Sequence, residues 1–117
     1  MLGRNVGDCE IKSISFMDGS VSFRLFDPAD TDYFTITFHS IGQLIFETGH
    51  TQNVIESIEI FESAEGAAQK VDGTPFLKKI DVEVFQSTWS AGMKVAYIQP
   101  ITGGETFISF KTFEIEG

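Results

Sequence analysis

The 117-residue chain has few of the residues that several classes of protein require. Its single cysteine, Cys9, cannot form an intramolecular disulfide, so the chain is not a disulfide scaffold. Basic residues number 8 against 17 acidic residues, and the net charge of −9 argues against nucleic acid or an anionic membrane as a partner. No apolar run approaches the roughly 18 residues that suggest a membrane span.

The stretch from Met1 to Glu10 also lacks the apolar segment of roughly 7 to 15 residues that a signal peptide needs. A free cysteine is compatible with a reducing compartment. We therefore expect a soluble, cytoplasmic protein. Its length suits one domain over residues 1–117, with a single sizeable core.

Leu and Ala are scarce, at 4 and 6 residues, whereas Ile, Val and Thr number 13, 7 and 10. This balance favours strands over helices, because β-branched side chains suit a pleated sheet. Phe accounts for 12 residues against 1 Trp and 2 Tyr. Phe has no polar group, so most of the aromatic content is expected in the core.

The dipeptide Asp18-Gly19 predicts a two-residue hairpin turn of type I′ between strands over residues 10–17 and 20–26. The register that follows separates apolar pairs from polar pairs. One side carries Phe16 with Val21, Ile14 with Phe23, and Lys12 with Leu25. The other side carries Met17 with Ser20, Ser15 with Ser22, and Ser13 with Arg24. We expect the first side, with its apolar residues Ile14, Phe16, Val21, Phe23 and Leu25, to face the core.

Alternation of apolar and polar residues predicts further strands over 33–39 and 80–84. Another strand is expected over 94–101, ending at Pro100, and Gly103-Gly104 leads into a last strand over 105–115. Residues 41–47 suggest a turn and a short strand that is buried between layers, and 53–62 a central or bulged strand. Residues 63–75 suggest a long loop or one helical turn. The predicted fold is all-β, an antiparallel sandwich or partly closed barrel of seven to eight strands with at most one or two short helical turns.

The sequence contains no convincing catalytic or metal motif. Asp27, Asp30 and Asp32 share a loop, but their spacing lacks the Gly and Glu of an EF-hand, and turn chemistry is the preferred interpretation. Cys9, His39 and His50 lack the paired spacing of a zinc site. A G-x-S-x-G motif is absent, and nothing selects two of the 17 acids as a catalytic pair. We predict no enzyme activity, no catalytic residue, no cofactor and no metal.

The segment from Tyr33 to Phe61 reads YFTITFHSIGQLIFETGHTQNVIESIEIF. A strand ending at Phe38, a short apolar piece, then Gly49 with Gln52-Asn53-Val54-Ile55 and a closing strand resemble the bacterial immunity-protein family numbered fifty. Asp8-Cys9-Glu10-Ile11 and the Asp18-Gly19 hairpin are similar to the opening of that family, so the resemblance covers residues 8–61. Gln52-Asn53 is its most specific match, which we interpret as a turn in which Asn53 caps local backbone with an unusual φ.

The resemblance implies a small protein of a polymorphic toxin system that inhibits a toxin by covering its active site. An acidic protein would associate quickly with a cationic toxin domain. The candidate partner-binding residues are acids on loops and solvent-facing strands: Asp27, Asp30, Asp32, Glu47, Glu56, Glu59, Glu62 and Glu65.

The alternative is a small binding or self-assembly domain whose ligand is a sugar, a peptide or a second copy. In that case Trp89 could stack on the ligand from a loop, although a lone Trp more often packs at the edge of a core. The sequence leaves the oligomeric state open.

Overall fold

The computed structural model describes residues 5–46, 51–63, 66 and 89–117. In these residues, eight antiparallel strands form one sheet in the order β4-β7-β6-β5-β1-β2-β3-β8, which confirms the all-β prediction. The strands are β1 (Glu10–Met17), β2 (Ser20–Asp27), β3 (Asp32–His39), β4 (Gln43–Phe46), β5 (Val54–Phe61), β6 (Lys94–Thr102), β7 (Thr106–Phe110) and β8 (Thr112–Glu116). The end strands β4 and β8 do not pair with each other, so the sheet is not closed.

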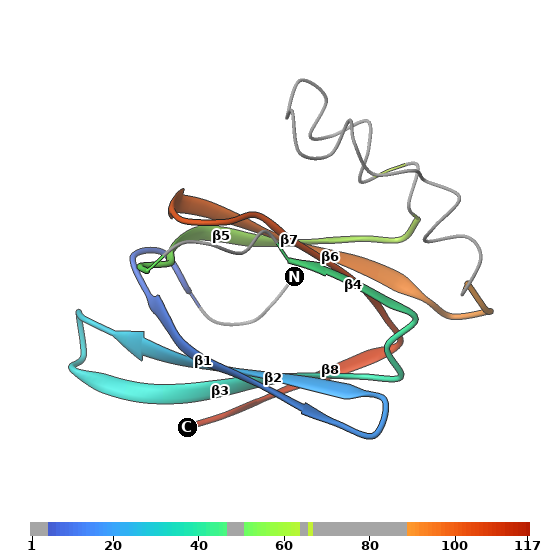
Figure 1. The fold of residues 1–117 in the computed structure, drawn as a ribbon, viewed down its shortest axis with the longest axis horizontal. Coiled ribbons are helices and arrows are strands. Elements are labelled where there is room, and N and C mark those ends of the chain that lie inside the picture. Colours follow the sequence, from blue (N-terminus) through green and yellow to red (C-terminus); the bar gives the residue numbers. More distant parts are fainter. Residues whose placement is uncertain (1–4, 47–50, 64–65, 67–88) are drawn as a thin grey trace.

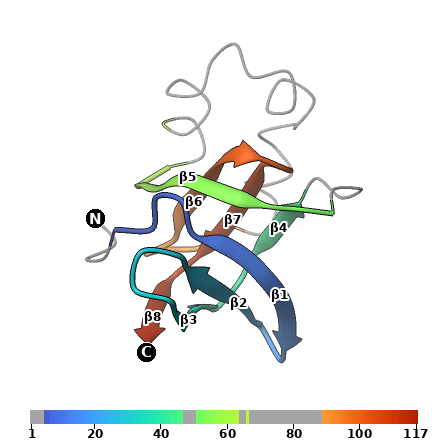
Figure 2. The same cartoon turned by 90° about the vertical axis from the view of Figure 1, so that its left-hand side faces the viewer.

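The sheet folds over itself into two layers, as Figures 1 and 2 show. One layer contains β4, β7, β6 and β5, and the other contains β1, β2, β3 and β8. The chain passes between the layers twice at one corner, from β3 to β4 and from β7 to β8. Hydrogen bonds from Gly42 N to Ser109 O (2.9 Å) and from Lys111 N to His39 O (3.1 Å) continue the strand pairing around this corner. The fold is therefore sandwich-like, with its core between the layers.

The β1–β2 hairpin confirms the predicted register from Met17–Ser20 to Ser13–Arg24. The predicted pair of Lys12 with Leu25 is wrong, because the register shifts and Ile11 lies opposite Leu25. Lys12 is exposed and forms an ion pair with Glu10 (3.0 Å). The shift keeps an apolar side chain against the buried Leu25 and leaves the lysine in solvent.

The turn of this hairpin also differs from the prediction. Gly19 has a φ of +76°, but Asp18 is not among the residues with positive φ. A type I′ turn needs positive φ at both positions, whereas a type II turn needs it only at the second. The φ values therefore follow the type II pattern.

The strand over residues 33–39 is confirmed, with Phe34, Ile36 and Phe38 fully buried on one side of β3. The Phe38 ring meets Phe23 edge-on from β2 and Phe110 from β7, at centroid distances of 6.0 and 5.0 Å. The contact with Phe110 joins the two layers, whereas Phe23 and Phe38 belong to the same layer. The core consists of Val6, Cys9, Val21, Phe23, Leu25, Phe34, Ile36, Phe38, Ile55, Ala96, Ile98, Ile108 and Phe110.

The predicted strand over 105–115 is two strands, because the chain turns the corner at Lys111. All five residues of β7 are buried, whereas exposed and half-buried residues alternate in β8. Ile108 faces the core, but Phe107 stacks on Tyr97 with ring centroids 4.7 Å apart, on the other side of the sheet. The layer of β6 and β7 thus buries apolar side chains on both faces.

The strand predicted over 53–62 is both central and bulged. β5 pairs with β6 along its length and with β1 at Glu10, and its register shifts on each side of Ile55. Pro100 lies opposite Ile55 at this irregular point, where the missing N–H of proline is tolerated. The strand predicted over 94–101 is β6. The prediction that it ends at Pro100 is wrong, because β6 continues to Thr102.

The short strand expected after Ile41 is β4, and its residues are half-buried. The strand predicted over 80–84, most of the loop or helical turn predicted over 63–75, and His50 lie outside the described residues. In the part of the chain that is described, no helix is long and apolar enough to cross a membrane.

Candidate functional site

The acidic loop between β2 and β3 is a local turn structure. Asp27 and Asp32 face each other across the two strands, and Asp27 Oδ1 accepts a hydrogen bond from the backbone N–H of Ala29 (2.9 Å). Carboxylate oxygens of Asp27, Asp30 and Asp32 lie within 4.8 Å of one another. The hydrogen bond from Ala29 N to Asp27 Oδ1 makes an Asx turn, which is the turn chemistry preferred for this loop from its sequence. Asp27 was predicted as an exposed partner-binding acid, but it is only 8% exposed, because its carboxylate turns back onto the loop.

The acids of β5, with Glu62 directly after the strand, form a second group. Glu56 and Glu62 are exposed, and Glu59 is half-buried opposite Tyr97 of β6. The remaining two predicted acids, Glu47 and Glu65, lie outside the described residues. β5 belongs to one layer and the β2–β3 loop to the other (Figure 1), so the predicted acids form two separate groups.

Tyr97 marks a polar site that sequence reasoning did not find. Burial raises the pKa of the Tyr97 phenol, and the Glu105 carboxylate raises it further by its charge and by a hydrogen bond. Glu59 and Glu56 add smaller effects in the same direction. The carboxylates of β5 therefore lie near a buried, protonated tyrosine, and its signal in the sequence is the apolar setting of Tyr97 between Ala96 and Ile98.

Gln52 and Asn53, the most specific part of the family resemblance, stand at a junction between distant segments. Asn53 Oδ1 accepts a hydrogen bond from the backbone N–H of Gly104 (3.1 Å). The prediction of a local cap with unusual φ is wrong: Asn53 does not have a positive φ, and its bond is to the turn after β6. The positive φ belongs instead to Gly103, at +109°.

A chain of polar side chains crosses the outer face of β2, β3 and β8. His39 Nδ1 lies 2.9 Å from Ser20 Oγ, and His39 Nε2 lies 3.0 Å from Glu114 Oε1. A serine, a histidine and a carboxylate thus meet, as nucleophilic catalysis requires. However, neither His39 nor Glu114 lines the pocket described below, and Ser22 and Thr37 form a similar cross-strand bond beside them (2.9 Å). The neighbouring pair favours a structural role for this chain.

Cys9 and Trp89 are the remaining residues with reactive or ligand-stacking side chains, and neither is exposed. Cys9 is fully buried in the core, and its carbonyl accepts a hydrogen bond from Ile55 N (2.8 Å). Trp89, the candidate for ligand stacking, is half-buried in the segment before β6.

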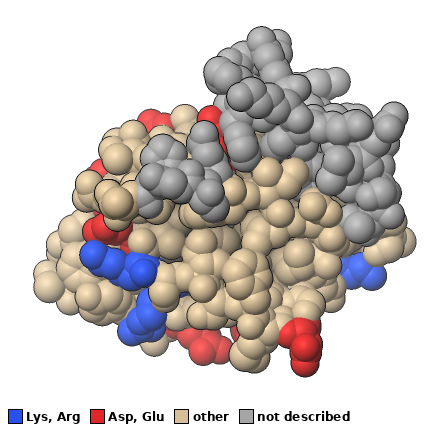
Figure 3. Space-filling model, in the orientation of Figure 1, with Lys and Arg blue, Asp and Glu red and all other residues tan. Residues whose placement is uncertain are grey.

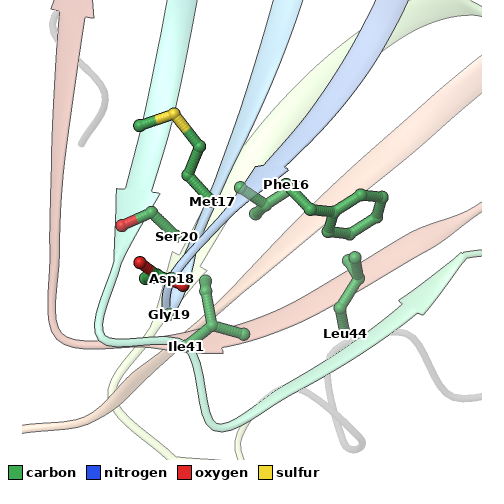
Figure 4. A pocket seen from close by; sticks show the side chains of 8 residues that line it. Phe16, Met17, Asp18, Gly19, Ser20, Ile41 and Leu44 are labelled. Carbon is green, nitrogen blue, oxygen red and sulfur yellow. The ribbon is translucent and has the colours of Figure 1, made fainter.

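A pocket of about 750 Å³ lies at the tip of the β1–β2 hairpin. Phe16 approaches it from β1, Leu44 from β4, and Ile41 from the turn between β3 and β4 (Figure 4). Phe16 was expected in the core but is 69% exposed, because the hairpin extends past the side chains that cover the rest of its apolar side. A possible signal was the apolar pair Phe16-Met17 directly before the turn.

A protein of known structure has a fold similar to that of this chain. The chain is similar to an uncharacterised protein from Neisseria gonorrhoeae whose crystal structure is known, with a TM-score of 0.57 and 13% sequence identity. The similarity covers 95% of this chain and 92% of that one. It shows that the two chains share a fold. No model of a protein family matches the chain, and no curated protein matches it.

Proposed function

We propose that this chain is a non-enzymatic binding protein, a bacterial immunity protein that neutralises a cognate toxin in the cytoplasm. The resemblance over residues 8–61 suggests the class. The observation that carries the proposal is the excess of carboxylates, which gives a net charge of −9. A negative protein captures a basic toxin domain faster than a neutral one, and an inhibitor of a toxin must act quickly.

The described residues support this proposal, because they contain 12 Asp and Glu against 4 Lys and Arg. Lys12 is already paired with Glu10, and the Arg24 guanidinium lies over the Tyr33 ring, 5.0 Å from its centroid. On the face in Figure 3, acidic side chains lie toward the margins, and Lys and Arg side chains lie at the left and right. The exposed acids Asp30 and Asp32 on one layer, and Glu56 and Glu62 on the other, are the candidate contacts for a cationic partner.

Co-expression tests the function directly. The toxin domain encoded beside this gene is expressed in a bacterial host with and without this protein, and growth is measured. The proposal expects growth only with the protein present. Failure to restore growth, although both proteins are produced, would overturn it.

Association kinetics identify the layer that faces the toxin. Two double variants, Asp30→Lys with Asp32→Lys and Glu56→Lys with Glu62→Lys, change the net charge equally, so each is the control for the other. We expect the pair at the interface to slow association about ten-fold or more at low salt, and the difference to shrink as salt rises. Equal rates for wild type and both variants would exclude an acidic binding surface.

A further inference from the structure

The hairpin tip exposes the large apolar side chains of two consecutive residues, which point to opposite sides of the hairpin. Phe16 is 69% exposed and Met17 is 76% exposed. Each borders the pocket at the tip, whose wall continues with Ile41 and Leu44. Scattered apolar side chains are ordinary on a surface, but an aromatic residue beside an apolar pocket is typical of an interaction site.

The pocket lies between two strand edges. β1 pairs with β2 along its length, but within the described ranges it pairs with β5 only at Glu10. β4 is the end of the strand order and, among the described strands, pairs only with β7. The part of β1 that contains Phe16 and the outer edge of β4 therefore have no neighbouring strand among the described residues. An extended peptide can add to such an edge through backbone hydrogen bonds while its side chains enter an adjacent pocket.

The size of the pocket suits side chains of a peptide. A volume of about 750 Å³ lies within the usual range for binding sites, roughly 300 to 1,000 Å³. In Figure 4, Phe16 lies above Leu44, and Ile41 lies between Leu44 and the hairpin turn. An aromatic or large aliphatic side chain placed there would contact all three.

Charge selects the kind of peptide. Among the described residues of the lining, Asp18 is the only charged one, so a lysine or arginine next to the inserted side chain would find a carboxylate. A second copy of this chain would bring another Asp18 and a net charge of −9, and like charges oppose association.

We propose that this pocket, lined by Phe16, Ile41 and Leu44 with Asp18 at the turn, docks an extended segment of a basic partner protein. The segment pairs with the edge of β1 or β4, inserts one apolar side chain beside Phe16, and places a cation near Asp18. This inference rests on the proposed function, because the toxin domain would supply the segment.

Two synthetic peptides with the same apolar residues test the pocket without the toxin. Lys-Phe-Lys-Val-Lys-Phe and Glu-Phe-Glu-Val-Glu-Phe are titrated into the isotope-labelled full chain, and amide resonances are followed by NMR. The basic peptide is expected to shift resonances of residues 14–20 and 41–46, and to bind at least ten-fold more tightly than the acidic peptide. Equal binding of both peptides, shifts confined to other residues, or no binding would overturn the proposal.

Substitutions provide the second arm. Phe16→Ser is expected to weaken binding of the basic peptide about ten-fold, whereas Ile101→Ser removes another exposed apolar side chain, 55% exposed and outside the pocket, and should leave binding unchanged. Both residues are exposed, so neither change should prevent folding. Equal loss in the two variants would contradict the proposal. A dimer in solution that Phe16→Ser dissociates would overturn it too, because the pocket would then hold a second copy.

Binding of the toxin separates this inference from the proposed function. If the toxin binds wild type and Phe16→Ser with equal affinity, the docking site is wrong and the immunity function stands. If the toxin does not bind but the basic peptide occupies the pocket, the immunity function is wrong and the docking site stands.

Discussion

The side-chain oxygen of Asn53 accepts a hydrogen bond from the backbone N–H of Gly104 at 3.1 Å, although 51 positions separate the two residues. The bond joins the start of β5 to the turn between β6 and β7. Beside it, the Asn53 carbonyl accepts a hydrogen bond from Ile11 N at the start of β1 (2.8 Å). Asn53 thus connects three segments that meet at one end of the sandwich.

Replacing Asn53 with Ala should lower the free energy of unfolding by about 1 to 2 kcal/mol, because the Gly104 N–H loses its acceptor in a half-buried site. Chemical denaturation measures the change. Asn5→Ala is the matched control: Asn5 Oδ1 accepts from Gly7 N at 3.0 Å, but that bond is exposed, so the expected loss is within about 0.5 kcal/mol. Equal losses in both variants would contradict a connecting role for Asn53.

Gly103→Ala should destabilise the fold more than the same change at Gly92. Both glycines have positive φ, +109° and +86°, which costs an alanine roughly 1 to 2 kcal/mol. A Cβ at Gly92 would meet nothing within 4 Å, whereas a Cβ at Gly103 would overlap Asn53 Oδ1 and lie 2.7 Å from the Gln52 carbonyl oxygen. Thermal unfolding of the two variants isolates the contact from the φ penalty. Similar melting temperatures would show that Gln52 and Asn53 do not pack against this turn.

The shifted register at the start of β1 can be tested with two neighbouring residues. Ile11 lies opposite the buried Leu25, so Ile11→Ala should cost about 1 to 2 kcal/mol, less than a fully buried isoleucine. Lys12→Ala should change stability by no more than about 0.5 kcal/mol, because its ion pair with Glu10 is at the surface. In the unshifted register Lys12 would face Leu25. A larger loss of stability in Lys12→Ala would therefore favour the unshifted register.

Local patterns predicted the parts of the fold that depend on neighbouring residues. The alternation of β3 and the pairing of Ile14 with Phe23 follow from period two and from the Asp18-Gly19 turn. The shift at Lys12 could not be read this way, because Ile11 is held by the carbonyl of Asn53, far along the chain.

The candidate site was harder to predict for the same reason. Whether Phe16 is buried depends on which strands lie across the hairpin tip, and alternation within the hairpin contains no information on that. The burial of Asp27 was also hidden, since a count of acidic residues does not show that one carboxylate turns back onto its own loop.

Tyr97 predicts a loss of stability at alkaline pH. Its pKa in the folded chain is raised above the ordinary value of 10.0, mainly by burial and then by Glu105. Above about pH 10 the unfolded chain releases the phenol proton while the folded chain retains it, so the unfolded state gains stability as pH rises. The free energy of unfolding should therefore fall by up to about 1.4 kcal/mol per pH unit from this group, with no effect well below pH 10.

The variant Tyr97→Phe provides the control, because it keeps the ring that stacks on Phe107 and removes the phenol. Its stability at neutral pH should be lower by about 1 kcal/mol, since the hydrogen bond with Glu105 is lost. Urea unfolding at several values between pH 8 and 11 compares the two proteins. All other groups are the same in the two proteins, so only the difference between the curves reports Tyr97. The stability advantage of the wild type over Tyr97→Phe should shrink and then reverse as pH rises. Curves that stay parallel would mean that the buried phenol does not retain its proton.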